Sequence, residues 1–134
     1  MTYSAQNSYT CEPGTPRRAR VWTLACIRDA LPDTFVHLLL DDVAVVVSEL
    51  VTHAMALGGH GVTVTVEVSD ETVRVTVACR GARRNASPPR EFEQHVVSGM
   101  HLVAALATDW RLDRVDEDCS ELWAELSLVQ ARAM

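Results

Sequence analysis

Hydrophobic residues recur at helical spacing in a first segment that begins near Thr15. Apolar side chains follow one another at intervals of three or four residues: Val21, Leu24, Ile27 and Leu31. Thr15 is predicted to cap this helix, and Pro16 suits its first turn because a missing amide hydrogen costs nothing there. The pattern ends at Pro32, so the sequence predicts a helix from Thr15 to about Leu31.

A second, longer helix is predicted from Asp33 or Thr34 to Leu57, where two glycines supply a C-terminal stop. Its apolar stripe is the most regular in the chain and comprises Val43, Val46, Val47, Leu50, Val51, Ala54 and Leu57. Helical spacing places Asp42, Glu49 and His53 together on one flank of that stripe. Such a flank lies at the border of the core, where a cleft could form.

The pattern then changes to a period of two, which is typical of half-buried strands. The alternating apolar positions are Val62, Val64, Val66 and Val68, followed by Val73, Val75, Val77 and Cys79. Ser69, Asp70 and Glu71 separate the two runs. The sequence therefore predicts a β-hairpin over this region.

From Arg80 to Ser98 the periodicity disappears, leaving a loop of about 19 residues. Loops beyond roughly 12 to 15 residues are usually functional lids or disordered segments. A third helix is predicted to open at Gly99, with apolar positions at Met100, Val103, Leu106, Ala107 and Trp110. A last hairpin follows, with arms at residues 110–115 and 121–129 around a turn at residues 116–118.

This order of elements predicts an α+β fold: a two-layer sandwich with a mixed, mostly antiparallel sheet and helices packed on one face. The length of 134 residues fits one domain, assigned to residues 15–129. Residues 1–14 are interpreted as a flexible lead-in with a short strand at Tyr9 to Cys11, and residues 130–134 as a C-terminal tail.

The amino-acid composition excludes several classes of catalytic and binding site. All twelve cationic residues are arginine, which excludes a lysine-dependent phosphate loop, a Schiff-base enzyme and a lysine general base. The net charge of −6 argues against direct nucleic-acid binding through phosphate neutralisation. The four cysteines are too widely spaced for a metal knuckle or a disulfide scaffold, so no metal site is expected and the thiols are interpreted as reduced. With no signal-like or membrane-spanning segment, we expect a cytoplasmic protein that does not bind membranes.

Three segments, in order, resemble the nucleotide-binding boxes of the histidine-kinase-like ATPases, and in particular the anti-sigma-factor serine kinases. DDVAVVVSELVTHAMALGG is similar to the helix of the first box, VRVTVACRGA to the strand and turn of the second, and VSGMHLVAALATDW to the third. LWAEL resembles the family's closing strand, and PRRARVWTLACIRDAL resembles the helix ahead of the first box. The resemblance implies the histidine-kinase-like ATPase fold for nearly the whole chain.

The first box departs from the family at its metal ligand. The resemblance implies that Glu49 is the catalytic base, and that the residue four positions later is an Asn whose oxygen helps to hold Mg²⁺. Here that residue is His53. Mg²⁺ prefers oxygen ligands, whereas imidazole nitrogen suits Zn²⁺ or Cu²⁺. His53 is therefore a poor magnesium ligand; it is alternatively a core histidine satisfied by Glu49, or part of a zinc site with Glu49 and Cys79.

The second and third boxes also depart from the family pattern. Cys79 stands where the family has an Asp that accepts from the adenine amino group, and Gly81 keeps the small residue two positions on. A thiol is a weak acceptor, and a lost buried charged hydrogen bond is worth roughly 1.5 to 3 kcal/mol. In the third box the family has two glycines that let backbone amides approach phosphates; here Val97 replaces the first, and only Gly99 remains.

The resemblance and its departures together predict a regulatory protein of the anti-sigma or partner-switching type, acting by protein–protein interaction with an impaired ATP pocket. Its expected partner is a sigma factor or an anti-sigma-factor antagonist, and the family implies a homodimer. Arginines of the loop in the nucleotide-lid position are predicted to meet carboxylates of the partner: Arg80, Arg83, Arg84 and Arg90. No cofactor is expected. The alternatives are an active serine/threonine protein kinase that uses ATP and Mg²⁺ with Glu49 as base, and a scaffold that binds neither nucleotide nor sigma factor.

Overall fold

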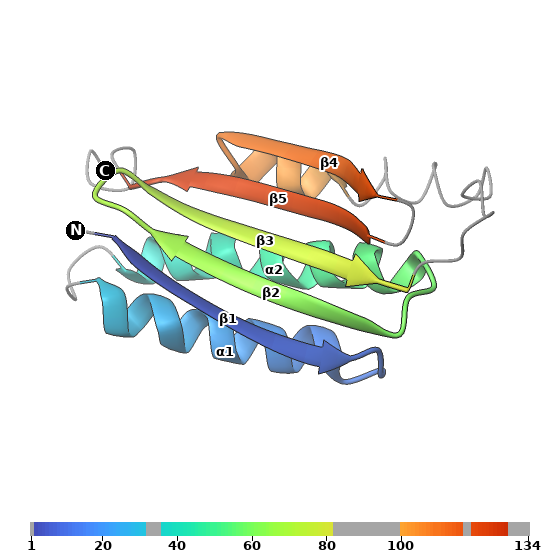
Figure 1. Ribbon diagram of the computed structural model, residues 1–134. Coiled ribbons are helices and arrows are strands. Elements are labelled where there is room, and N and C mark those ends of the chain that lie inside the picture. The colour runs from blue at the N-terminus through green and yellow to red at the C-terminus, as the bar shows by residue number, and fades with distance from the viewer. Residues whose placement is uncertain (1, 32–35, 82–99, 117–118, 129–134) are drawn as a thin grey trace.

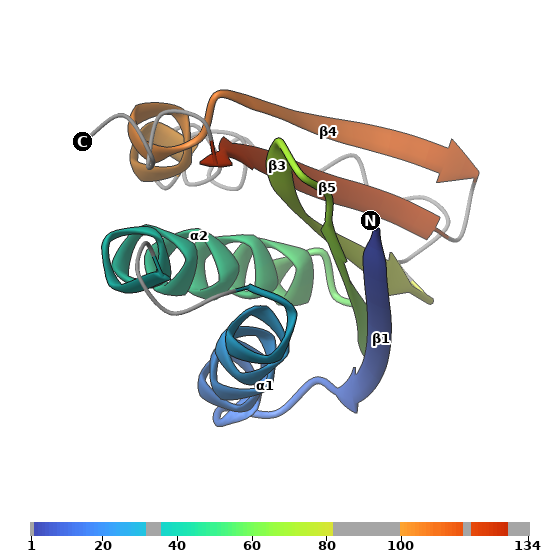
Figure 2. The same ribbon diagram turned by 90° about the vertical axis from the view of Figure 1, so that its left-hand side faces the viewer.

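The computed structural model describes residues 2–31, 36–81, 100–116 and 119–128. Within them, five strands form one sheet in the order β1-β2-β3-β5-β4. The strands are β1 (Tyr3–Thr10), β2 (Gly61–Val68), β3 (Thr72–Arg80), β4 (Asp109–Asp116) and β5 (Cys119–Ser127). α1 (Thr15–Ala30), α2 (Val36–Ala56) and a helical segment at residues 100–106 lie on one face of the sheet (Figures 1 and 2). The predicted two-layer α+β arrangement is confirmed.

The sheet differs from the prediction in one respect. A mixed sheet was expected, but all four neighbouring strand pairs among the described residues are antiparallel. β3 and β4 run in the same direction, yet β5 lies between them and pairs with both. The position of β5 between β3 and β4 is a tertiary arrangement. The alternation of apolar and polar residues along each strand does not predict it.

The core lies between the helices and the sheet. The period-two pattern sends every second residue of β2, β3 and β5 toward the helices, where these side chains are buried. Val64, Val75 and Val77, for example, are fully buried. The regular apolar stripe of α2 packs on them, and Val46, Val47 and Leu50 are likewise fully buried. The hairpin of β2 and β3 and the buried face of α2 follow the sequence pattern closely.

The first helix begins at Thr15, one residue before the predicted first position at Pro16, so Thr15 is not its cap. The N-cap position is Gly14, which offers no side-chain hydrogen bond. The Thr15 hydroxyl is instead fully buried, donates to the carbonyl of Thr10 at 2.6 Å and accepts from the amide of Glu12 at 3.1 Å. Thr15 therefore joins the end of β1 to the start of α1.

The N-terminal segment is more ordered than its sequence suggested. The interpretation of residues 1–14 as a flexible lead-in is wrong for residues 3–8, and the short strand expected at Tyr9 to Cys11 is the end of a longer strand that stops at Thr10. Residues 3–10 form β1, which pairs with β2 from Tyr3 opposite Val68 to Thr10 opposite Gly61. The strand has no clear period-two pattern of apolar residues, so the sequence did not reveal it. It lies at the edge of the sheet, and of its side chains Tyr3 and Tyr9 pack against the core.

The elements after residue 100 have other boundaries than predicted. Residues 100–106 are helical, and Met100 and Val103 are buried in the core. Trp110 lies in β4 rather than on the helix, because the strand begins at Asp109. The last hairpin is confirmed as β4 and β5, with a register irregularity between Arg114 and Asp116.

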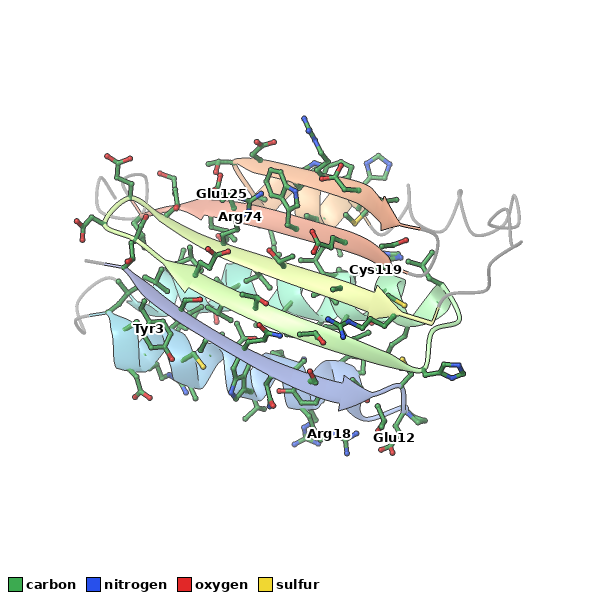
Figure 3. The ribbon with its side chains drawn as sticks, in the orientation of Figure 1. Tyr3, Glu12, Arg18, Arg74, Cys119 and Glu125 are labelled. Atoms are coloured by element: carbon green, nitrogen blue, oxygen red, sulfur yellow. The ribbon has the colours of Figure 1, made fainter. Side chains whose placement is uncertain are left out.

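No described helix covers the second face of the sheet, which is turned toward the viewer in Figure 1, and the strands place polar side chains such as Thr63, Thr65 and Arg74 on it. Near its centre the guanidinium of Arg74 lies 3.9 Å from the ring centroid of Trp123, and Glu125 stands opposite Arg74 on β5 (Figure 3). Among the described residues, no helix has both the length and the apolar character that a membrane span requires. We refer below to the face of the sheet opposite the helices as the open face.

Candidate functional site

The candidate site begins on α2 with Glu49 and His53, which are one helical turn apart. The Oε2 atom of Glu49 lies 3.4 Å from Nε2 of His53. His53 is only 3% exposed, whereas the Glu49 side chain is 29% exposed. Asp42, further up the same flank, is partly buried, and this burial together with the neighbouring Asp41 raises the pKa of its carboxyl. The predicted flank at the border of the core is confirmed.

The environment of His53 determines what it can bind. Both of its ring nitrogens are shielded from solvent, and one of them faces the Glu49 carboxylate. A histidine in this position offers a buried nitrogen, not the exposed oxygen that a hydrated magnesium ion would need. Because Mg²⁺ demands oxygen ligands in octahedral geometry, the pair fits that ion poorly.

Cys79 lies near the end of β3, on the buried side of the sheet. Its side chain has no exposed surface, and it accepts a hydrogen bond from the backbone amide of Gly59. Burial raises the pKa of the thiol, which the bond from Gly59 partly offsets. A neutral buried thiol is a small core residue and a weak acceptor, so it offers little to an adenine amino group.

The turn after α2 is joined directly to the end of β3. The amide of His60 donates to the carbonyl of Arg80 at 3.0 Å, and a side chain at Gly59 would collide with the sulfur of Cys79. Gly81 follows with φ of +80°, and a Cβ atom there would lie 2.6 Å from Cδ2 of His60. Glycine is therefore required at both positions, and residues 59–60 and 79–81 form one tightly packed corner.

Sequence reasoning identified Cys79 and Gly81 in this corner but missed Gly59 and His60. The signal for Gly59 was present, because two consecutive glycines follow α2, but both were interpreted only as a helix stop. One of them, Gly58, does have the positive φ of a C-terminal stop, at 81°. Gly59 serves instead to let the backbone approach Cys79.

Of the remaining predicted site residues, the structure describes only Arg80. Arg80 is exposed at the end of β3. Arg83, Arg84, Arg90, Val97 and Gly99 lie outside the described residues. No group of three or more His, Cys, Asp or Glu side chains among the described residues is arranged to hold a metal ion.

A separate hollow lies at the start of α1, and sequence analysis did not anticipate it. Its volume is about 470 Å³, and its lining consists of Gly14, Arg17, Arg18, Val21 and Trp22. Arg18 is held at its rim by an ion pair with Glu12, with Nη2 and Oε2 2.9 Å apart (Figure 3). This pair lowers the pKa of the Glu12 carboxyl. None of the lining residues belongs to α2 or β3.

Comparison with known proteins adds no family to these observations: the chain matches no protein-family model and no curated protein.

Proposed function

We propose that this protein is a regulator of the anti-sigma or partner-switching type, which acts by binding another protein and has a degenerate, histidine-kinase-like nucleotide pocket. The observation that carries the proposal is that His53 is buried beside Glu49, with Nε2 and Oε2 3.4 Å apart. The residue in the magnesium-ligand position is a buried imidazole, and its nearest described acid is the residue that would act as catalytic base.

The second observation that supports an impaired pocket is the burial of Cys79. In an adenine site of this family type the corresponding side chain must reach the ligand as a charged acceptor. Cys79 is uncharged, fully covered and hydrogen-bonded to Gly59. Losing that one charged bond would weaken adenine binding by roughly 10- to 150-fold.

The α+β architecture is compatible with the proposed family, since α2 packs on the sheet and its C-terminal turn contacts the end of β3. The proposed partner is a sigma factor or an anti-sigma-factor antagonist. Arg80, at the exposed end of β3, is the described member of the proposed arginine contact. Self-association as a homodimer belongs to the same proposal.

The test measures nucleotide and protein binding together. We expect no rise in melting temperature when ATP and Mg²⁺ are added to the pure protein. The sigma factors and antagonists of the same organism are expressed and tested one at a time, and we expect one of them to bind with an affinity that ATP does not change. A nucleotide at 100 times its dissociation constant would add about 2.7 kcal/mol of stability. Such a shift, or transfer of phosphate to a serine of an antagonist, would favour the kinase instead.

Restoring the family residues provides the converse experiment. The variant His53→Asn/Val97→Gly leaves the core residue Cys79 in place, and adding Cys79→Asp completes the restoration. We expect nucleotide binding to increase from the double to the triple variant, because each change returns an oxygen ligand or a close backbone approach. Circular dichroism checks folding, since a carboxylate at position 79 is buried. A folded triple variant without nucleotide binding would count against the proposed pocket.

A further inference from the structure

The sheet has two edges, and β4 forms the one beside β5 (Figure 1). No described strand pairs with its outer side. Unpaired edges present a row of backbone donors and acceptors that another strand can extend, and proteins commonly protect them with charges, bulges or covering elements. β4 carries both charges and exposed apolar side chains, and these determine which kind of strand its outer side can accept.

The side of β4 that faces the helix layer is apolar and exposed. Trp110 pairs with Ala124 and Leu112 with Leu122, and both partners are buried beneath the helix layer. Trp110 is nevertheless 37% exposed and Leu112 is 43% exposed. Two large apolar side chains therefore stand next to each other at the rim of the core, on a strand with one unpaired side.

The other side of β4, on the open face, alternates in charge. Asp109, Arg111 and Asp113 follow one another at two-residue intervals. Across the ladder, Asp109 stands opposite Glu125 and Asp113 opposite Glu121. Like charges directly opposite each other destabilise a sheet. A cation on the unpaired side of Asp113 would offset this repulsion.

We propose that β4 pairs with β4 of a second copy of this chain, antiparallel and about a twofold axis at Leu112. An isologous interface requires a self-complementary surface. This register places Arg111 of each copy opposite Asp113 of the other, and Leu112 opposite Leu112. The two sheets then continue into one sheet of ten described strands, with Leu112 of each copy meeting on the helix side and Trp110 opposite residue 114.

Other registers fit worse. Centring the axis on Arg111 places that arginine opposite itself and Asp109 opposite Asp113, and centring it on Asp113 places two carboxylates in contact. Centring it on Trp110 also pairs Asp109 with Arg111, but only residues 109–111 of the strand overlap. The axis at Leu112 overlaps residues 109–115, of which residues 110–114 precede the register irregularity between Arg114 and Asp116 and can pair regularly. A shift by one residue would set the apolar side of one copy against the charged side of the other.

The size of the contact sets its expected strength. One strand edge of this length buries less than the roughly 1,200 Å² at which stable interfaces begin, so the dimer should be weak, with a dissociation constant on the order of micromolar. The inference does not depend on the proposed function, because it uses only the edge, the exposure and the charges of β4. A protein that is monomeric in solution would overturn it together with the proposed self-association, but would leave the proposed binding partner and the impaired nucleotide pocket untouched.

Sedimentation equilibrium from about 1 µM to 1 mM tests the interface, since this range brackets the micromolar estimate. We expect a monomer–dimer equilibrium in the unmodified protein. Leu112→Lys, Arg111→Asp and Asp113→Arg should each raise the dissociation constant at least about tenfold, because each creates like-charge contacts across the twofold axis. The exchange Arg111→Asp/Asp113→Arg should restore it to within about threefold, because the pairing is again complementary.

The control substitutions are Val21→Lys and Arg17→Asp on α1. They reproduce the apolar-to-charged change and the charge reversal at exposed positions outside β4. We expect both to leave dimerisation unchanged. A dimer that is insensitive to Leu112→Lys, that weakens equally with the α1 variants, or that the charge exchange fails to restore would overturn the proposal and point to another surface, such as the open face.

A cross-linking experiment tests the register independently. Directly opposite residues of antiparallel strands have Cα atoms about 4.5 or 5.5 Å apart, within the range of a disulfide. Leu112→Cys should therefore give a covalent dimer on mild oxidation. Trp110→Cys should not, because residue 110 faces residue 114 of the second copy. The unmodified protein controls for its own cysteines, and equal cross-linking of the two variants would exclude this register.

Discussion

The two edge strands of the sheet, β1 and β4, are equally long but differ in what covers them. Tyr3 and Tyr9 on the helix side of β1 pack against the core beside α1. Trp110 and Leu112 on the same side of β4 remain 37% and 43% exposed. The helix side of β4 is thus less covered than the helix side of β1. Side-chain pattern specifies the face of a strand, but neighbouring elements decide whether that face is buried.

The two edges also differ in how they are anchored. β1 is connected to α1 through the buried hydroxyl of Thr15 and through a contact between Tyr3 and Cys26. β4 is bordered on its inner side by like charges, at Asp109 opposite Glu125 and at Asp113 opposite Glu121. We therefore expect β1 substitutions to change folding stability, and β4 substitutions to change association.

The largest effect is expected where β1 meets α1. Thr15→Val keeps the shape of the side chain but leaves the Thr10 carbonyl and the Glu12 amide without their bonds to the hydroxyl. Two orphaned groups at roughly 1 to 3 kcal/mol each, partly relieved by water, predict a loss of about 2 to 4 kcal/mol in the free energy of unfolding. Urea denaturation measures it.

The matched control for Thr15→Val is Thr52→Val, because Thr52 is exposed and its hydroxyl bonds only to the carbonyl of Ser48 within α2. Its loss should stay within about 0.5 kcal/mol. Equal losses at the two positions would remove the distinction between an anchoring threonine and an ordinary helical one.

A smaller effect is expected from Tyr3 at high pH. Its hydrogen bond with Cys26, followed by burial, raises the pKa of Tyr3 above 10. The folded protein therefore keeps this proton to higher pH than the unfolded chain does. The contribution of Tyr3 to the free energy of unfolding is complete below about pH 10 and is lost as the pH rises toward the pKa of the folded state. The free energy of unfolding then falls by at most about 1.4 kcal/mol per pH unit.

Tyr3→Phe should make the decline in stability above about pH 10 less steep. Part of the slope should remain, because burial also raises the pKa of Tyr9. Unfolding measured at several pH values between about 8 and 11 gives both slopes, spanning the ordinary tyrosine pKa. Identical slopes in the two proteins would show that Tyr3 is not anchored through its hydroxyl.

The smallest effect on stability is expected at the other edge. Leu112→Lys replaces an exposed side chain, and its alkyl stem can cover the same surface. The free energy of unfolding of the monomer should change by no more than about 0.5 kcal/mol at a protein concentration below the dimer range. A loss above about 2 kcal/mol would instead mean that Leu112 belongs to the core, and the contrast between the two edges would fail.

The sequence predicted most of the fold because its two main periods are strong. Four valines of β2 and the stripe of α2 each bury one face, and a chain with these patterns has few other ways to cover them. It missed most of β1, whose polar composition is compatible with a loop. The strand forms because β2 offers eight residues of unpaired backbone, a long-range effect that no local pattern records.

For the candidate site, the sequence determined which chemical groups are present, including an imidazole at position 53 and a thiol at position 79. Only the tertiary structure decided that His53 is buried against Glu49, that Gly59 packs under Cys79, and that Leu112 stays exposed at an edge. The physical reason is that covalent order fixes chemistry and local period, whereas burial, solvation and pairing depend on segments distant along the chain.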